Sequence, residues 1–283
     1  MTTLSNVDIE KELGKNILIF PFYNGNLKCA SYNLTASWLA WNISNGESCY
    51  DNFKKKVVIP GRATVLVETN ETIWVSSEIS GTYHSKVYMV SKGLGHIGTT
   101  LDTDYIGPSL IAVHNHSDHE IELTPEIDSF VSIVFRYVKT KSSVAHDNDP
   151  GRQDILRRNF GTTKLNISDT ENDWLNQDFR KYKKSLKERL EQEPDNSDYK
   201  RIIKARKSRT SWYLGFIPYI IFSLVIISSL SWGAYLYANQ TNLKSKYSWY
   251  TAATFLTDKI ATGFIGALVV QFINDLQRKN KGS

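Results

Sequence analysis

The feature that most constrains this chain is a long uncharged segment near its C-terminal end. Residues Trp212–Ala238 carry no charged side chain, and about 27 residues of helix at 1.5 Å each extend roughly 40 Å. The hydrocarbon core of a bilayer is only about 30 Å thick. Tryptophan and tyrosine near both ends match the aromatic belts of membrane interfaces. The segment predicts a transmembrane helix, with a buried core helix as the alternative.

A second apolar segment predicts that the chain crosses the membrane twice. Trp249–Ile273 is apolar except for Asp258 and Lys259, which lie at membrane depth unless the span begins after them. Basic residues flank the two segments, so the positive-inside rule places both termini in the cytoplasm of a cell whose inner membrane holds the protein. The predicted two-pass hairpin covers residues 211–274, and a basic cytoplasmic tail covers 275–283.

Residues 1–138 have the pattern of a mostly-β domain. Short runs rich in β-branched and aromatic residues alternate with turns that contain glycine, proline and asparagine. The expected strands are NILIF, KVVI, TVLVET, TIWV, KVYMV, SLIAV, EIEL and SFVSIVFRYV. Their short, near-regular spacing favours a distorted β-barrel or jelly-roll over βαβ units.

A polar arm and a helical linker are expected to join this domain to the membrane. Residues 139–168 are polar and rich in turn formers, and residues 169–210 have helical periodicity and many basic side chains. A helix is expected from Asp169, with Asp169 or Thr170 as its cap. The apolar positions on one face of this helix are Trp174, Phe179, Tyr182, Leu186 and Leu190.

The basic residues at the end of this linker predict a contact with the lipid bilayer. Six basic residues and no acid lie within residues 200–210, directly before the first apolar segment. Such a cluster binds anionic lipid headgroups. A nucleic-acid patch is the alternative, but the position beside a membrane span favours lipid, and no nucleic-acid partner is expected.

Four segments of the β domain resemble one known superfamily. They are PFYNGNLKCASYNL (21–34), IPGRATVLVETNETIWV (59–75), TLDTDYIGPSLIAVHN (100–115) and IELTPEIDSFVSIVF (121–135). In this order and spacing they resemble the dCTP deaminases and trimeric dUTPases. The resemblance covers about residues 17–138. It implies a dUTPase-like head, a homotrimer with its sites at subunit boundaries, and a deoxynucleotide ligand.

The resemblance also implies roles for particular residues. Asp102 matches the acidic residue near the sugar 3′-hydroxyl, and Tyr105 matches the ring that packs on the deoxyribose. The Gly-Arg-Ser-Ser stretch that contacts phosphate in the family falls on Tyr83–Lys86, where His84 replaces the arginine and Lys86 one of the serines, while Ser85 is kept. Without the resemblance, Asp102 would be interpreted as a turn residue that accepts hydrogen bonds from neighbouring amides.

The polar arm contains a further echo of the superfamily. In GRQDILRRNFGTTKLN, the residues Arg157, Arg158, Phe160 and Thr162 resemble the arm that closes over the nucleotide in dUTPases. Closure of such an arm excludes water and strengthens charged contacts. An amphipathic basic linker is the alternative interpretation of the same segment.

One departure from the family pattern and one alternative metal site affect which reaction the chain could catalyse. The position of the deaminases' acid–base glutamate is Ala112, which cannot carry a proton, so deamination is expected to be lost. Hydrolysis of the dUTPase type, with Asp102 and a Mg²⁺ ion that arrives with the nucleotide, stays open. His114 and His116 could share a metal ion on one strand face, but a polar surface turn is favoured and no metal site is expected.

Three functions are consistent with these observations. The first is a membrane-anchored nucleotide sensor or effector without deaminase activity, whose ligand state acts on the membrane helices of a trimer, as in antiviral defence against phage. The second is a membrane-bound dUTP or dCTP pyrophosphatase that uses Asp102. The third is a non-catalytic head that binds another protein.

Overall fold

The computed structural model describes residues 2–207, except for 97, 145–148, 161–162 and 195, together with residues 219, 222, 223 and 226. The chain forms a compact unit that ends at Arg206, and this unit is called the head below. Apart from the last four positions, both predicted membrane spans lie outside the described residues. In the part of the chain that is described, no helix has the length and hydropathy needed to cross a bilayer.

The head is built mainly from strands, with short helices between and after them. The strands are β1 (Thr2–Thr3), β2 (Ile17–Phe20), β3 (Leu27–Lys28), β4 (Ser31–Asn42), β5 (Tyr50–Asp51), β6 (Lys56–Ile59), β7 (Thr64–Val75), β8 (Ile79–Ser85), β9 (Leu94–His96), β10 (Thr100–Leu101), β11 (Ile106–Asn115), β12 (Ile121–Leu123), β13 (Ser129–Tyr137), β14 (Asn159–Phe160) and β15 (Thr163–Lys164). The helices are α1 (Asn6–Glu12), α2 (Val87–Ser91), α3 (Gln153–Arg157), α4 (Asp169–Leu175) and α5 (Lys183–Gln192), and the 3₁₀ turns are η1 (Asn24–Asn26), η2 (Pro150–Arg152) and η3 (Asp178–Arg180).

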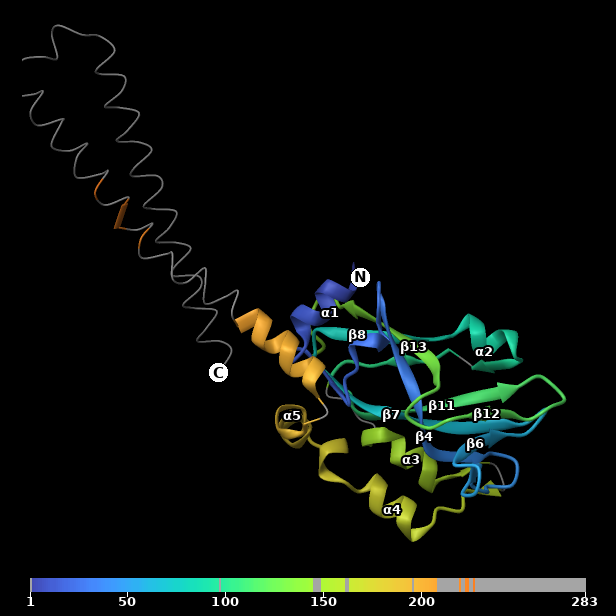
Figure 1. Ribbon diagram of the computed structural model, residues 1–283. Coiled ribbons are helices and arrows are strands. Elements are labelled where there is room, and N and C mark those ends of the chain that lie inside the picture. The colour runs from blue at the N-terminus through green and yellow to red at the C-terminus, as the bar shows by residue number, and fades with distance from the viewer. Residues whose placement is uncertain are drawn as a thin grey trace, which may run out of the picture. The chain divides into compact units, whose positions relative to one another are not determined.

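One sheet of ten strands dominates the head and curls into a half-barrel (Figure 1). Its strands follow the order β10-β8-β13-β4-β7-β11-β9, and β1, β2 and β3 pair with β13, β7 and β4. A smaller sheet has the order β12-β6-β5. The pairs within these sheets are antiparallel, which allows short turns to join successive strands. The prediction of a mostly-β head is therefore confirmed.

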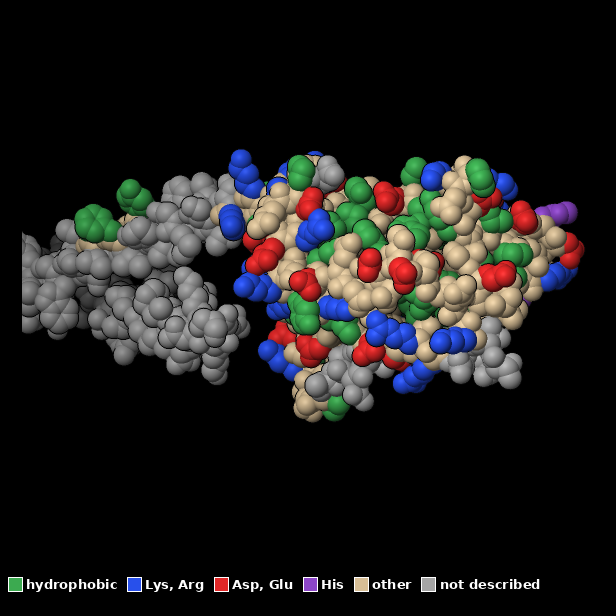
Figure 2. All heavy atoms as spheres, turned by 90° about the horizontal axis from the view of Figure 1, so that it is seen from below, with side chains coloured by type: hydrophobic (Ala, Val, Ile, Leu, Met, Phe, Trp, Pro, Cys, Tyr) green, Lys and Arg blue, Asp and Glu red, His purple; other side chains and the backbone are tan. Residues whose placement is uncertain are grey.

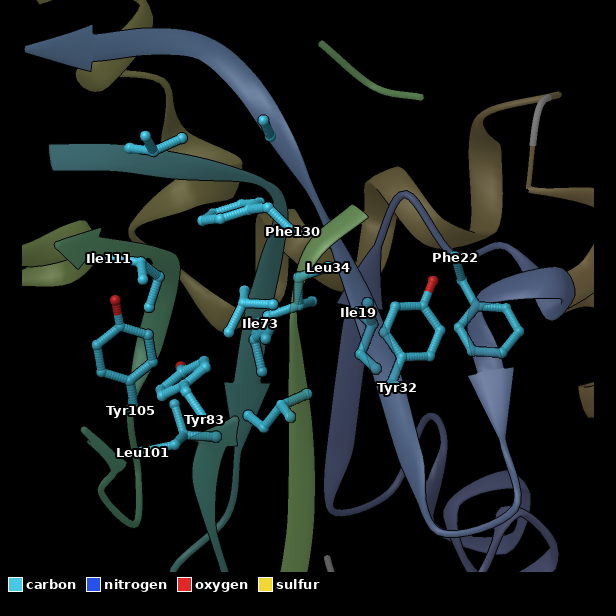
Figure 3. Packing of buried hydrophobic residues seen from close by; sticks show 14 of the residues in the cluster. Ile19, Phe22, Tyr32, Leu34, Ile73, Tyr83, Leu101, Tyr105, Ile111 and Phe130 are labelled. Carbon is cyan, nitrogen blue, oxygen red and sulfur yellow. The ribbon is translucent and has the colours of Figure 1, made fainter. Parts of the chain in front are cut away.

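The central strand β7 explains where the core lies. It is buried at all positions except Thr64 and Asn70, because the strand is covered on both faces. A strand covered on both faces shows a continuous rather than an alternating apolar pattern. The expected strands TVLVET and TIWV are therefore a single strand. Figure 3 shows Ile73 of β7 packed with Leu34 of β4 in this core.

One expected strand is a helix. KVYMV was expected to be a strand because of its β-branched and aromatic residues, whereas Val87–Ser91 forms α2. The side chains of Val87, Tyr88 and Val90 are exposed. They therefore lack the packing against neighbouring strands that makes such residues favourable in a sheet. Gly93, with a φ of +95°, lies in the turn between α2 and β9.

Residues 169–192, which follow the last strand, form three short helical elements, α4, η3 and α5. Ser168 caps α4 and forms a capping box with Glu171, so the cap lies one residue before the predicted positions. In Figure 1, α3, α4 and α5 lie along one side of the sheet. Phe179 of η3 contacts the ring of Phe20 edge-on at 5.4 Å. Of the five residues on the predicted apolar face, Tyr182 is exposed, at 60%, and the other four are buried or half-buried.

The basic helix at residues 197–207 docks on α1. Nη1 of Arg206 donates to the backbone oxygens of Lys11 and Leu13 at 2.9 and 2.7 Å, which satisfies carbonyls near the end of α1. Gly14 follows with a φ of +76°, and a Cβ there would lie 2.7 Å from the hydroxyl of Tyr199. The close approach of the helix to α1 therefore depends on a glycine at position 14.

The surface of the head carries both signs of charge. Figure 2 shows acidic and basic side chains interspersed on one face, with apolar atoms between them. Ion pairs account for part of this pattern, since Lys54 and Lys56 both contact Glu122, at 3.0 and 2.5 Å. Such exposed pairs contribute little to stability. The two cysteines are free.

Candidate functional site

A cavity of about 400 Å³ opens beside the Asp102–Tyr105 loop. Its lining comes from β7, β8, β10 and β11, from the loops next to β10, and from Arg152 of η2 and Ile155 of α3. Its apolar lining consists of Leu66, Leu101, Leu110, Ile111, Ala112 and Ile155. Its polar lining consists of Tyr83, Thr99, Thr100, Asp102, Tyr105, Ser109 and Arg152. A hollow that combines apolar walls with several polar groups is typical of a small-molecule site.

Tyr105 forms a wall of this cavity. A turn with Asp104 in the left-handed region (φ 60°) brings Tyr105 into the head, where its side chain is 5% exposed. Its hydroxyl donates to the backbone oxygen of Pro108 at 2.5 Å. Burial raises the pKa of Tyr105 well above its ordinary value, so the phenol stays neutral. Figure 3 shows the rings of Tyr105 and Tyr83 close to Leu101.

A β-bulge positions Ser109 in the same wall. The pairing of β7 with β11 shifts register between Pro108 and Leu110, and such bulges re-aim side chains near functional sites. The amide of Ser109 donates to Oγ1 of Thr69 at 2.8 Å, and its Oγ lies 2.5 Å from the hydroxyl of Tyr83. Burial raises the pKa of Tyr83 above its ordinary value. The sequence placed Tyr83 at the start of the phosphate-contacting stretch without giving it a role of its own, and it gave no sign of Ser109, because the bulge has no local signature.

Asp102 and Ala112 line the same cavity. Asp102 directly follows β10 and is exposed, and it is the only carboxylate among the lining residues. Ala112 lies on β11 opposite Leu66 of β7 and contributes a methyl group. The position that the sequence predicted for a proton-carrying glutamate thus faces the cavity, beside the predicted sugar contacts.

The predicted phosphate-contacting residues lie elsewhere in the single chain. His84 and Ser85 are the last residues of β8 and Lys86 follows them, and none of the three lines the cavity. The ring of His84 bonds to the hydroxyl of Thr82 at 2.9 Å and is exposed. Oγ of Ser85 lies 2.6 Å from Nδ1 of His96, and Lys86 contacts the hydroxyl of Ser129.

The predicted closing arm divides into parts with different positions. Arg157 ends α3 and Arg158 follows it, and both are exposed outside the cavity lining. Phe160 lies in β14, and Thr162 lies outside the described residues. Arg152, which sequence analysis did not single out, lines the cavity instead. The preceding Pro-Gly pair marks a turn but gives no sign of what that turn contacts.

Two buried carboxyl groups lie on β7. Glu71 is fully buried and accepts from the amide and the hydroxyl of Thr35, at 2.8 and 3.0 Å. Burial raises the pKa of Glu71 to about 8. Glu68 is also fully buried, and its Oε2 lies 2.5 Å from Nη2 of Arg180 in η3. Burial raises the pKa of Glu68, and Arg180 opposes that shift.

The Glu68–Arg180 contact is an ion pair rather than an aligned hydrogen bond. Neither carboxylate oxygen of Glu68 has a hydrogen-bond partner among the described residues. Glu68 faces Leu110 across the β7–β11 pairing, and Leu110 lines the cavity. The η3 segment is therefore held on a strand residue that is paired with a lining residue of the cavity.

The histidine cluster was the alternative metal site. His114 and His116 stack edge-on with 4.3 Å between ring centroids, and Nδ1 of His114 lies 2.8 Å from the hydroxyl of Thr64. No group of three histidine, cysteine or acidic side chains within the described residues is arranged to hold a metal ion.

Comparison with known proteins finds similar solved structures. No family model and no curated protein matches the sequence. The 2′-deoxycytidine 5′-triphosphate deaminase from Agrobacterium tumefaciens is 13% identical with a TM-score of 0.40, and the match covers 48% of each chain. The EIAV dUTPase is 19% identical with a TM-score of 0.32 over 48% of this chain and 93% of that one. The dUTPase from phage phi11 of S. aureus is 12% identical with a TM-score of 0.33 over 47% of this chain and 97% of that one.

These similarities cover about half of this chain at low sequence identity, and the chain spans about half the length of the matched deaminase.

Proposed function

We propose that this chain is a membrane-anchored nucleotide-binding protein whose head holds a nucleotide in the cavity beside Asp102. The observation that carries this proposal is that Asp102, Tyr105 and Ala112 line one cavity. These positions were selected from the sequence for three separate roles. Their convergence supports a single ligand site that has kept its binding residues and has lost the proton carrier.

The arrangement of the cavity suits a sugar. Tyr105 lies in the cavity wall with its hydroxyl bonded to Pro108, and an aromatic side chain in a wall is a surface on which a sugar can pack. The carboxylate of Asp102 is exposed at the opening and accepts hydrogen bonds from sugar hydroxyls. The volume of about 400 Å³ lies within the usual range for small-molecule sites.

The chemistry of the lining favours binding over deamination. A deaminase needs a group that moves protons near neutral pH. Ala112 has none, and burial raises the pKa values of Tyr83 and Tyr105 away from neutrality. Hydrolysis of the triphosphate is the second candidate, because Asp102 fits a Mg²⁺ ion that is otherwise held by phosphate oxygens and water. When bound, that ion would neutralise charge on the phosphates.

The membrane and assembly parts of the proposal have separate support. The uncharged segment of about 27 residues supports an anchor in the inner membrane, with the basic residues before it in contact with lipid headgroups. The sequence resemblance supports a homotrimer. A ligand that binds two states of such a trimer differently would shift the packing of its membrane helices. We propose a sensor or effector role of this kind, in antiviral defence.

The test is a thermal-shift panel on the detergent-purified full chain. Deoxynucleotides and ribonucleotides with Mg²⁺ are compared, and a ligand at about 100 times its Kd should stabilise the head by roughly 2.7 kcal/mol. Asp102→Asn and Tyr105→Ala should remove the shift. The control Asp118→Asn should keep it, because Asp118 is 74% exposed and pairs only with Arg62 outside the cavity.

The outcomes separate the three functions. Release of pyrophosphate from dUTP or dCTP during the same incubation would establish the hydrolase. A shift without turnover would establish the sensor. If no nucleotide stabilises the wild-type chain, the head does not bind nucleotides and the role in protein interaction is favoured.

A further inference from the structure

Arg152 occupies a constrained position at the cavity. It follows Pro150 and Gly151 in η2 and has a left-handed backbone with a φ of 53°. The turn is pressed against β11, because a Cβ on Gly107 would lie only 2.2 Å from the amide nitrogen of Gly151. The backbone that carries Arg152 is thus fixed to the strand that follows Tyr105.

The guanidinium group of Arg152 is also held in place. Its Nε and Nη2 donate to the two carboxylate oxygens of Asp154, at 3.0 and 3.1 Å. Such a fork fixes the plane of the guanidinium group. The hydrogen bond with Asp154 raises the pKa of Arg152, so the charge is permanent. The side chain stays 33% exposed, and no hydrogen-bond partner for Nη1 occurs among the described residues.

The cavity therefore has two poles of opposite charge. Among the described residues, Asp102 is the only acid and Arg152 the only base that line the cavity, and Asp154 does not line it. A ligand that satisfies both poles offers hydroxyl donors to Asp102 and an anionic acceptor to Arg152. An arginine N–H suits a phosphate oxygen, because the charge-assisted bond is short and strong.

We propose that Arg152 is a specificity-determining residue, whose Nη1 donates to a phosphate oxygen of the ligand and selects nucleotides over nucleosides. This inference rests on the proposed nucleotide binding and adds the group that distinguishes the phosphorylated ligand. It assigns to Arg152 a role that the sequence suggested for Arg157 and Arg158, which do not line the cavity.

The inference is tested by isothermal titration calorimetry on the full chain in detergent. The probes are deoxyuridine, dUMP and dUTP, and deoxycytidine, dCMP and dCTP. Arg152→Asn is the main variant, because asparagine tolerates the left-handed backbone. It should weaken binding of the phosphorylated probes by roughly 10- to 100-fold, the usual effect of one charged hydrogen bond, and leave nucleoside binding unchanged.

Two further variants separate charge from fold. Arg152→Lys should recover part of the nucleotide affinity, because it keeps the charge without the fork. Arg62→Asn is the matched control. Arg62 has a left-handed φ of 60° and its Nε pairs with Asp118 at 2.8 Å, but it lies outside the cavity lining. This control should change neither affinity.

Each other outcome overturns the inference. Equal weakening of nucleosides and nucleotides by Arg152→Asn would show that Arg152 contacts the base or only supports the fold. Unchanged nucleotide affinity would show that it makes no contact. If wild type binds none of the six probes, the proposed function fails, and the inference fails with it. Nucleotide binding that is indifferent to Arg152 would refute the inference alone.

Discussion

Replacing Glu71 with glutamine should change how the stability of the head depends on pH. The carboxyl group is fully buried, and its pKa is about 8 in the folded head compared with 4.5 in the unfolded chain. Between these values the folded state binds a proton that the unfolded state has released. By linkage, this group stabilises the head fully below pH 4.5, and its contribution is lost as the pH rises towards 8.

The size of the effect follows from the same values. One pKa unit corresponds to about 1.4 kcal/mol, so wild type should lose roughly 2–3 kcal/mol from this group between pH 5 and pH 7. Glu71→Gln keeps an oxygen acceptor for Thr35 but cannot titrate. The variant should therefore lose that much less stability over the same interval, while all other titrating groups cancel in the comparison.

The assay is urea denaturation of both full-length proteins at pH 5, 6, 7 and 8, followed by the fluorescence of the buried tryptophans. The expected result is a difference in unfolding free energy, wild type minus variant, that falls steadily with pH. A difference that stays constant, or that rises with pH, would refute the assignment of Glu71 as a buried, neutral carboxyl group.

Two further substitutions test how the helical segment is held on the head. Gly14→Ala should destabilise the docking of residues 197–207 by about 1–3 kcal/mol, because the backbone there has a φ of +76° and the new Cβ would lie 2.7 Å from the hydroxyl of Tyr199. Hydrogen exchange should show that the amides of this helix lose protection. Unchanged protection would contradict the account. Arg180→Met should destabilise the head by about 3–5 kcal/mol, because it leaves Glu68 buried without its partner. Chemical denaturation of Arg180→Met and of the double variant with Glu68→Gln tests this, since the second change should restore much of the loss.

Local signals explain what the sequence predicted correctly. Runs of β-branched and aromatic residues identify β11 and the two halves of β7 as strands without any tertiary information, but they do not show that the two halves form one strand. The Asp102–Tyr105 loop is a short turn between strands. Asp102, Tyr105 and Ala112 were selected through the family resemblance rather than from a local pattern, and the structure places all three in the lining of one cavity.

The missed features depend on contacts between distant segments. Arg152 reaches the cavity only because the turn at Gly151 packs against Gly107. Val87–Ser91 has the composition of a strand but forms a helix whose side chains Val87, Tyr88 and Val90 are exposed. Arg180 pairs with the buried residue Glu68. Nothing in the sequence around either residue indicates that these two distant charges meet inside the core.

The central claim, that a nucleotide occupies the cavity beside Asp102, is tested most directly by photo-crosslinking. The full chain is irradiated with 5-iodo-dUTP or 5-iodo-dCTP, and the modified peptides are mapped by mass spectrometry. The account predicts crosslinks within residues 98–112 or 152–155. Their yield should fall when unmodified nucleotide is added in excess, and they should disappear in Tyr105→Ala. Crosslinks confined to other parts of the head, or none that compete, would contradict it.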